Sequence, residues 1–321
     1  MVTILNQRIL VTGGAGFIGS HLVERLLYEG AKVTVLDNFN TGKEHNLKMV
    51  YNHPNFRFVK GDIRNRSLVD EVVDGQNIVF HFCDDSDIKS AAAHPDSYVE
   101  QNIMGLYYVL ESMRKHNVKT ILFPSSTTVL GEIKKWPASE DHGPLAPLSL
   151  YGGAKLAAEG LISAWANTFG LTAIVFRFVG IIGGRMDHGV VHDFVRKLEV
   201  NDKELEILGD GTQSRSFVII DDCIDAMLLC LFKLKDPYQL VHIGNKDQIS
   251  INTTADAICS ALSYSEVKRK YTGGKVGWIG DSTSNFILTE TLDKLGWRPA
   301  KTSEQAVSEA AKRLSLRKAV S

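Results

Sequence analysis

Two side chains that could carry acid–base chemistry, Tyr151 and Lys155, lie four residues apart in the segment SLYGGAKLAAE. On a helix this spacing puts both side chains on one face, so that they can meet at one site. An ammonium group beside a phenol favours the phenolate and can lower the phenol pKa from about 10 toward neutrality. The pair is therefore a candidate general base. The alternative is an ordinary pair of surface side chains.

Ser126 is a further candidate, because it follows the apolar run KTILFP at residues 119–124. We expect this run to be a strand of a parallel sheet, and open α/β sheets bind ligands at the carboxyl ends of their strands. The Ser126 hydroxyl could hydrogen-bond a substrate oxygen there. A serine after a strand is also a common turn former, and that interpretation stays open.

A glycine-rich segment, TGGAGFIG, stands between the first apolar run and the first helical pattern. It satisfies both G-x-G-x-x-G, with Gly14, Gly16 and Gly19, and the wider G-x-x-G-x-x-G, with Gly13 in place of Gly14. A Cβ at these positions would block the tight turn and the approach of a pyrophosphate to the amides at the helix N-terminus. The segment therefore predicts a dinucleotide site, although such turns also occur for steric reasons alone.

Two aspartates follow the next apolar runs and could bind the same dinucleotide. Asp37 ends the run KVTVLD, about 20 residues beyond the glycines, where a carboxylate can hold the adenosine ribose. Such an acid would repel a 2′-phosphate, which favours NAD over NADP. Asp62, in KGDIR, is placed to reach the adenine edge, and the alternative is that it caps the following helix.

The elements that must position these residues alternate between short β-branched runs and helical patterns. Such alternation indicates βαβ units, and the apolar continuity of the runs fits a doubly wound parallel α/β sheet covered on both faces. After residue 178 the rhythm changes, which predicts a dinucleotide-binding domain over residues 1–178 and a smaller mixed α/β substrate lobe over 179–321, partly interleaved with the sheet. The expected strands are 8–12, 32–37, 56–60, 77–82, 119–124 and 172–178, and the expected helices are 17–29, 67–73, 96–116, 149–169, 221–234, 252–262 and 303–315.

The composition is ordinary for a globular protein, with 321 residues of which 44% are hydrophobic and 23% charged. Lys and Arg number 36 and Asp and Glu 37, so a net charge of −1 leaves no positive excess for a nucleic acid or an anionic membrane. The longest apolar run, residues 226–232, is far shorter than the roughly 20 residues that span a bilayer. Four cysteines without a C-x-x-C pair indicate reduced thiols and a cytoplasmic protein. We expect no metal site.

With these residues in place, the chain resembles the extended short-chain dehydrogenase/reductase family, most closely its nucleotide-sugar epimerases of the archaeal UDP-glucose 4-epimerase type. The resemblance covers nearly the whole chain, because ten segments match family motifs in the family's order. It implies a Rossmann-type sheet, NAD as the cofactor, and a homodimer formed through the helices near 96–116 and 149–169. The segments are TGGAGFIGSH, LDNFNTG, KGDIR, HFCDDSDIKSAAAHP, EQNIMG, FPSSTTVLG, LYGGAK, GDGTQSRSFVIIDD, HIGN and LGWRP.

The resemblance also gives each candidate residue a role. Tyr151 is implied as the catalytic base and acid, Lys155 as the ribose ligand that lowers its pKa, and Ser126 as a hydrogen-bonding partner of the substrate. The residues implied around NAD are Gly13, Gly16, Phe17, Ile18, Gly19, Asp37, Asn38, Asp62, Ile63, Asn102, Tyr151 and Lys155. Those implied at the nucleotide sugar are Ser126, Thr127, Arg185 and Arg215, the two arginines pairing with the diphosphate unless they are surface charges or members of ion pairs.

The activity that this resemblance implies is epimerisation of a UDP-sugar at C4. Tyr151 takes the proton of the sugar hydroxyl while NAD takes the hydride from the same carbon. The keto sugar then turns over, and the hydride returns to its other face. The substrates would be the UDP-glucose and UDP-galactose pair or the N-acetylhexosamine pair, which a small Ser282 or Ser284 in a pocket wall could admit unless these serines cap a loop.

Other activities remain open as alternatives. The family's 4,6-dehydratases carry Thr-Asp-Glu where this chain has Ser126, Thr127 and Thr128, so a dehydratase or reductase would need other acids. Asp84, Asp85, Asp87 and Cys83 could supply them. A UDP-glucuronate 4-epimerase and a non-enzymatic sensor of NAD or a nucleotide sugar are further alternatives.

Four residues depart from the family pattern. Leu130 stands in place of a tyrosine, Gly180 in place of an asparagine and Gly184 in place of a proline. Cys83 occupies a position that is commonly alanine. Because these changes reshape the substrate side, the sugar is left open.

Overall fold

The computed structural model describes residues 4–85, 95–133, 137–275, 277 and 283–318. The chain divides into two compact units. The first contains residues 1–130, 144–177 and 227–241, and the second contains residues 131–143, 178–226 and 242–321. The residues of the candidate catalytic and cofactor sites all belong to the first unit.

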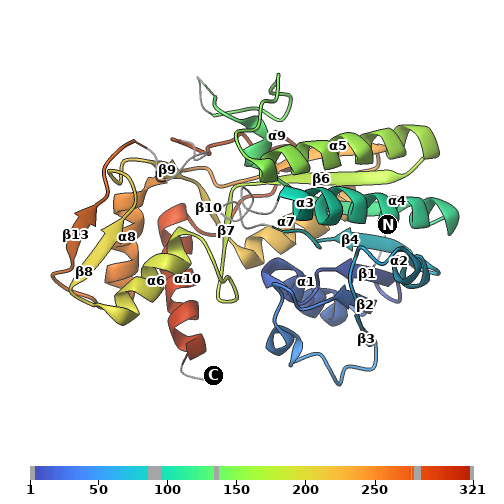
Figure 1. The fold of residues 1–321 in the computed structure, drawn as a ribbon, viewed down its shortest axis with the longest axis horizontal. Helices are drawn as coiled ribbons and strands as arrows, with labels where there is room; N and C mark the ends of the chain where they lie inside the picture. The colour runs from blue at the N-terminus through green and yellow to red at the C-terminus, as the bar shows by residue number, and fades with distance from the viewer. Residues whose placement is uncertain (1–3, 86–94, 134–136, 276, 278–282, 319–321) are drawn as a thin grey trace. The chain divides into compact units, whose positions relative to one another are not determined.

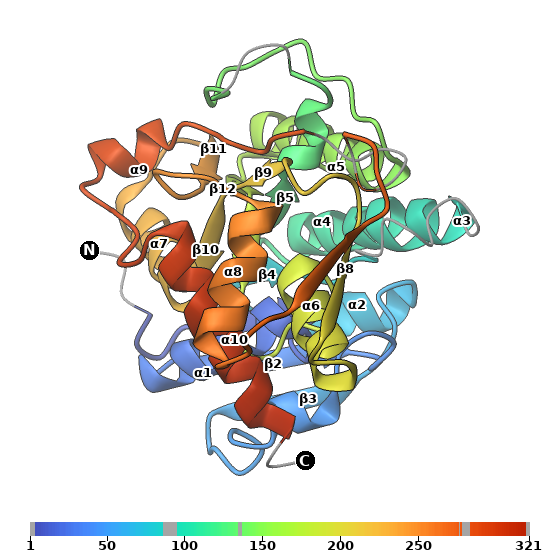
Figure 2. The same cartoon turned by 90° about the vertical axis from the view of Figure 1, so that its left-hand side faces the viewer.

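A seven-stranded sheet is the centre of the first unit, with the order β11-β6-β5-β4-β1-β2-β3. Figure 1 labels β1 to β4 and β6, and Figure 2 labels β5 and β11. The pairs β3–β2, β2–β1, β1–β4 and β4–β5 run parallel. The predicted doubly wound parallel sheet is confirmed. The strands are β1 (Arg8–Thr12), β2 (Lys32–Asp37), β3 (Phe56–Lys60), β4 (Ile78–His81), β5 (Thr120–Ser126), β6 (Thr172–Phe178) and β11 (Tyr238–Ile243).

Helices cover both faces of this sheet, which explains why its strands are continuously apolar. Along β1, Leu10 packs into a core shared with α2, α4 and α5, whereas the alternate residues Ile9 and Val11 are buried on the face where α1 packs. The helices α4 and α5 lie side by side (Figure 1). The helical elements are α1 (Phe17–Tyr28), η1 (Glu44–Leu47), α2 (Arg66–Val73), α3 (Pro95–Ser97), η2 (Tyr98–Met104), α4 (Gly105–Lys115), η3 (Thr127–Leu130), α5 (Leu150–Phe169) and α7 (Ile220–Lys233).

The single helix expected over 96–116 is in fact three consecutive segments. A π-helical stretch, η2, separates the short α3 from α4. Each π turn accommodates one more residue than an α turn, so the side chains of η2 are rotated relative to those of α4. Tyr98 and Asn102 are the buried side chains of η2.

The second unit packs α6, α8 and α10 together, as Figure 2 shows. Its described strands form three two-stranded sheets, β10 with β7, β12 with β9, and β13 with β8. Among the described residues, no helix is long and apolar enough to cross a membrane. The elements are β7 (Gly180–Ile182), α6 (Val190–Val200), β8 (Glu204–Ile207), β9 (Ser214–Arg215), β10 (Phe217–Ile219), β12 (Ile249–Ser250), α8 (Ile251–Ala261), β13 (Lys268–Tyr271), α9 (Glu290–Lys294) and α10 (Ser303–Lys318).

Candidate functional site

The candidate site begins where β1 and β4 end side by side, since the strand order reverses between them and ligands bind in the crevice at such a point. Gly13 follows β1 with a φ of +69°. A Cβ on Gly13 would lie 2.7 Å from the backbone of Phe82 and Cys83, which follow β4. Only glycine fits this contact without strain. The Cys83 amide also donates to Thr12 Oγ1 at 3.3 Å, which joins the two strand ends.

The turn continues directly into α1, whose first residues are Phe17 and Ile18. A Cβ on Gly19 would overlap the carbonyl oxygen of Gly13 and lie 2.9 Å from Gly14 Cα. The glycines therefore let the helix N-terminus close onto the turn, and the first amides of an α-helix have no acceptor within it. A backbone cradle of this shape, with amides directed outward, fits the pyrophosphate of a dinucleotide.

Replacing Gly19 with alanine is expected to weaken cofactor binding. The new methyl group must displace backbone atoms, and overpacking of this kind costs about 1–3 kcal/mol. If the whole cost falls on the bound state, NAD affinity falls by roughly 5- to 150-fold, as measured by isothermal titration calorimetry. Gly160→Ala is the matched control, because its Cβ meets nothing within 4 Å. Equal affinities for both variants would contradict the assigned cradle.

Asp37 lies directly beside the turn and is 6% exposed. Its two carboxylate oxygens accept hydrogen bonds from the amides of Ala15, at 2.9 Å, and Phe39, at 2.8 Å. Burial raises the pKa of Asp37, while the two amide bonds act in the opposite direction. Phe39 adopts a left-handed φ of +62°, unusual for a bulky residue, and its amide thereby reaches the carboxylate. Each oxygen can accept further bonds, as from ribose hydroxyls.

Asn38 and Asp62 also come together, with Asn38 Nδ2 donating to Asp62 Oδ2 at 3.0 Å. Arg64 donates to both oxygens of Asp62, and these bonds lower the pKa of Asp62 to about 2. The alternative that Asp62 caps the next helix is wrong, because Asn65 is the N-cap of α2 and accepts from Leu68. Ile63, in contrast, is buried in the core.

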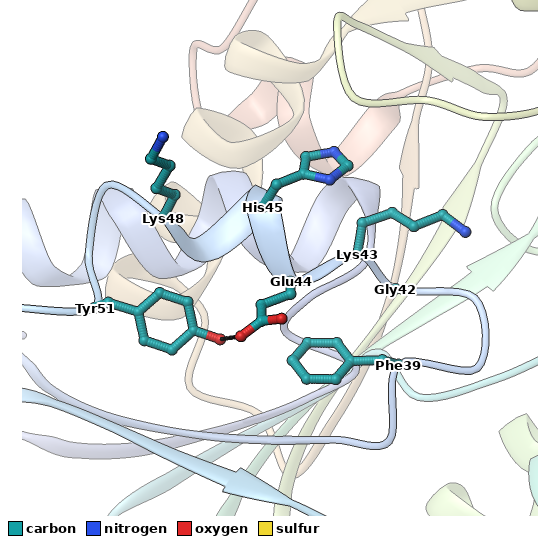
Figure 3. Close-up of a pocket in the computed structure, with 7 residues that line it drawn as sticks. All are labelled: Phe39, Gly42, Lys43, Glu44, His45, Lys48 and Tyr51. Carbon is teal, nitrogen blue, oxygen red and sulfur yellow. Dashed lines mark hydrogen bonds between the residues drawn. The ribbon is translucent and has the colours of Figure 1, made fainter. Parts of the chain in front are cut away.

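A hollow of about 670 Å³ opens beside the segment that follows Asp37 (Figure 3). In Figure 3 the Tyr51 hydroxyl points toward Glu44, with 3.5 Å between the two oxygens. Gly42 closes the segment against the glycine turn, since a Cβ there would lie 3.0 Å from Ala15 and from Asp37 Oδ1. This places the hollow on the adenosine side of the candidate cofactor site. Its lining residues are Phe39, Gly42, Lys43, Glu44, His45, Lys48 and Tyr51.

The loop after β4 is fastened by Asn102 from η2. Asn102 Oδ1 accepts from the Asp85 amide at 2.8 Å, and Asn102 Nδ2 donates to the Asp85 carbonyl at 3.1 Å. The Asn102 side chain thus orders the loop by binding the backbone of Asp85. Cys83 is not a ready acid or base, because burial raises the pKa of its thiol. Asp87 lies outside the described residues.

Ser126, Tyr151 and Lys155 come together at the end of β5. Ser149 caps α5 by accepting from the Gly152 amide at 3.1 Å, so Tyr151 stands in the first turn of the helix. Tyr151 shares a side-chain hydrogen bond with Ser126. Lys155, 2% exposed, donates to the Pro124 carbonyl at 2.5 Å, and its Nζ lies 5.6 Å from the centre of the Tyr151 ring.

Lys155 has a further partner that sequence reasoning did not assign to it, the carboxylate of Asp84. The distance from Lys155 Nζ to Asp84 Oδ2 is 2.5 Å. The pKa of Tyr151 is raised well above its ordinary value, first by burial and then by the charge of Asp84. Burial and the Asp84 charge thus act against the lowering of the Tyr151 pKa that the sequence predicts for Lys155.

His81 completes the polar surroundings of Lys155 as a neutral side chain. Burial, followed by the charge of Lys155, lowers the pKa of His81 to about 3. Its Nδ1 lies 2.8 Å from Thr12 Oγ1, a bond that links β4 to β1. His81 therefore adds no positive charge to the site at neutral pH.

A buried ion pair ties α5 to the sheet one turn beyond Lys155. Glu159 accepts from Arg177 Nε at 3.0 Å and from Nη2 at 2.7 Å, and Ser125 Oγ donates to Glu159 at 2.5 Å. Both charged side chains are 5% exposed. Because Tyr151, Lys155 and Glu159 are spaced by four residues, this pair fixes the helix face that carries the candidate base.

The remaining predicted substrate residue of the first unit, Thr127, is buried in η3, and the neighbouring Thr128 Oγ1 has no partner among the described residues. Leu130 is also buried. Arg185 and Arg215 lie in the second unit. Arg215 ends β9 and donates to the Ser214 carbonyl. The pKa of Arg317 is lowered first by burial and then by the charge of Arg185.

Two of the family departures have a packing reason within the second unit. A Cβ on Gly180 would lie 2.8 Å from the ring of Phe217, and one on Gly184 would lie 3.0 Å from Arg313 Cβ. Ser284 donates to Gln248 at 2.9 Å and accepts from the Phe286 amide, as a loop-capping serine does. Ser282 lies outside the described residues.

A dinucleotide cradle and a Tyr-x-x-x-Lys helix at one edge of the sheet define the fold of an NAD-dependent enzyme. The chain belongs to the NAD dependent epimerase/dehydratase family, whose model matches residues 9–244. A similar protein, from Methanocaldococcus jannaschii, carries the name UDP-glucose 4-epimerase provisionally. It is 33% identical over 300 residues, which cover 91% of this chain and 93% of that protein. The predicted family and NAD cofactor are confirmed.

Solved structures similar to this chain include both epimerases and dehydratases. The UDP-glucose 4-epimerase of Thermotoga maritima, with UDP-glucose, is 28% identical with a TM-score of 0.87, covering 98% of this chain and 100% of that one. The dTDP-glucose 4,6-dehydratase of Streptomyces venezuelae, with NAD bound, is 25% identical with a TM-score of 0.90, covering 98% of each chain. The fold is therefore common to both reactions.

Proposed function

We propose that this protein is an NAD-dependent UDP-sugar 4-epimerase, acting on UDP-glucose and UDP-galactose or on the N-acetylhexosamine pair. The observation that carries the proposal is that Ser126, Tyr151 and Lys155 lie together. The next two residues after Ser126 are threonines, where the dehydratases carry the carboxylic acids Asp and Glu. Epimerisation needs one group that removes and returns a single proton. Dehydration needs an additional acid and base at C5 and C6.

The proposed chemistry divides between the cofactor and the side chains. NAD, when bound by the glycine turn and Asp37, supplies reversible hydride acceptance at the sugar carbon. Tyr151 takes the hydroxyl proton and later returns it, which general acid–base catalysis requires. Ser126, which shares a hydrogen bond with Tyr151, would hydrogen-bond the sugar oxygen that reacts. Lys155, held by Pro124, has a third ammonium hydrogen for a ribose hydroxyl.

A dehydratase is the second candidate, because Asp84 places a carboxylate 2.5 Å from Lys155. It gives the site a carboxylate that can accept a proton, which the threonines do not supply. UDP-glucuronate 4-epimerisation is a variant of the main proposal with a different sugar. A sensor of NAD or a nucleotide sugar is the non-enzymatic alternative.

The test is product analysis with purified protein. UDP-glucose, UDP-N-acetylglucosamine and UDP-glucuronate are incubated separately without added reductant, and the products are resolved by chromatography with mass detection. We expect a new peak of unchanged mass, which names the sugar. A product lighter by one water would instead establish a dehydratase. Bound NAD without any product from the three sugars would favour the sensor.

We also propose that the protein forms a homodimer through α4 and the neighbouring α5. Leu106 is fully buried inside the subunit and is not available for this contact. Tyr107, Trp165 and Phe169 form a row of ring contacts at 6.0 and 5.5 Å, and Phe169 is 38% exposed. Sedimentation equilibrium measures the mass directly, and a monomer would overturn this part of the proposal.

A further inference from the structure

Asp84 stands in a loop whose backbone is fastened on both sides. The Cys83 amide donates to Thr12 Oγ1, and both backbone groups of Asp85 bond the Asn102 side chain. The Asp84 side chain is itself only 17% exposed. The sheet and η2 thus fix the place of this carboxylate, and it does not depend on a free loop.

The ammonium of Lys155 gives two of its hydrogens to groups of the protein. It donates to the Pro124 carbonyl and pairs with Asp84, both at 2.5 Å. The aromatic face of Phe123 lies beneath it, with 4.6 Å from Nζ to the ring centre. In this buried position, where the Lys155 side chain is 3% exposed, the lysine charge requires a counter-ion, and Asp84 supplies it.

Tyr151 lies within reach of both charges. Opposite charges within about 4–6 Å favour the ionised form of a group, and like charges disfavour it. The positive charge of Lys155 and the negative charge of Asp84 therefore act on the phenol in opposite directions. The other titratable groups around the pair are His81 and Cys83 at the end of β4 and Tyr98 from η2. Burial keeps the first two uncharged at neutral pH, because the pKa of His81 is lowered and that of Cys83 is raised.

We infer that Asp84 is the counter-ion of Lys155 and that it withholds the lysine charge from Tyr151 in the resting enzyme. The inference rests on the proposed function, in which Tyr151 is the base. Asp84 is a positioning residue, which acts on Tyr151 by neutralising the charge of Lys155 and by its own negative charge. It sets the pH above which Tyr151 can accept a proton, since the phenolate fraction grows as pH rises through the tyrosine pKa.

The test is a titration of Tyr151 by itself. The protein has nine tyrosines, so the ultraviolet tyrosinate signal of a Tyr151→Phe variant is subtracted from that of the parent protein at each pH. With Asp84→Asn we expect the midpoint of the Tyr151 signal to fall by about 1–3 pH units. The acidic limb of the turnover profile should move in the same direction. The conservative variant Asp84→Glu keeps the charge and should keep the high midpoint.

Asp85→Asn is the matched control, because it removes the same charge one residue away, and it should leave the midpoint unchanged. An unchanged midpoint in a folded Asp84→Asn protein, checked by circular dichroism, would overturn the inference. If Asp84→Asn does not fold, Asp84→Ala takes its place, and a midpoint equal to that of the parent protein is again the contradicting result. The titration needs no substrate. A shifted midpoint without epimerisation would therefore refute the proposed function alone.

Discussion

Tyr151→Phe is expected to lower turnover by about 100- to 10,000-fold, the usual contribution of a general acid–base group. The variant keeps the ring and removes only the hydroxyl that shares a hydrogen bond with Ser126. Lys155 is paired with Asp84, and burial raises the pKa of the Cys83 thiol, so the proposal assigns the exchange of the sugar hydroxyl proton to Tyr151. The initial rate of product formation, followed by chromatography, measures the loss.

Cofactor affinity separates this loss from a disturbed fold. NAD binding to Tyr151→Phe, measured by calorimetry, should stay close to that of the parent protein, because the glycine turn and Asp37 are untouched. Tyr28→Phe is the control for an ordinary tyrosine, as Tyr28 is 86% exposed. If Tyr151→Phe kept a rate within tenfold of the parent protein, Tyr151 could not be the base.

Glu159→Ala is expected to lower the free energy of unfolding by about 3–5 kcal/mol. The variant leaves the guanidinium of Arg177 buried without its carboxylate, and the loss of one partner from a buried pair has this magnitude. It also removes the acceptor of the Ser125 hydroxyl. Urea unfolding followed by circular dichroism gives the difference, provided that the slope with denaturant is unchanged.

Two further variants test whether the loss of stability in Glu159→Ala comes from the burial of the ion pair. Glu29→Ala breaks an exposed ion pair, in which the side chains of Arg25 and Glu29 are 38% and 40% exposed. It should lower the free energy of unfolding by less than about 1 kcal/mol. The double variant Glu159→Leu with Arg177→Met replaces both charges by apolar groups and should recover much of the loss. A cost for Glu159→Ala no greater than that for Glu29→Ala would contradict the importance of the buried pair.

The sheet and the glycine turn could be predicted because their signals are local. Strands β1 to β3 match the predicted ranges, since buried strands of a doubly wound sheet are short apolar runs between turn residues. The signal for α6 was also present. Its buried residues Val191, Phe194, Val195 and Leu198 follow helical spacing, and the prediction overlooked it. In contrast, β9 and β12 have two residues each, too few for any pattern.

The part of the site that the sequence did not reveal depends on contacts between distant segments. Asp84 and Lys155 are 71 positions apart, and nothing local indicates that a loop carboxylate turns toward a helix lysine. The π-helical turn of η2 is likewise invisible in residue pattern, because the same residues read as one continuous helix. Without that turn the contact of Asn102 with the Asp85 backbone could not be anticipated.

The first unit is assembled from three separate stretches of chain, and its edge strand β11 comes from the last of them. During synthesis, β6 therefore exposes an unpaired edge until residues 238–243 have left the ribosome, and such edges invite aggregation. We expect nascent chains to need chaperone protection during this interval. For the same reason, recombination that exchanges only residues 1–178 between relatives would join a sheet to a foreign edge strand. An exchange of the cofactor unit between relatives therefore has to include residues 227–243, so that β11 stays with its sheet.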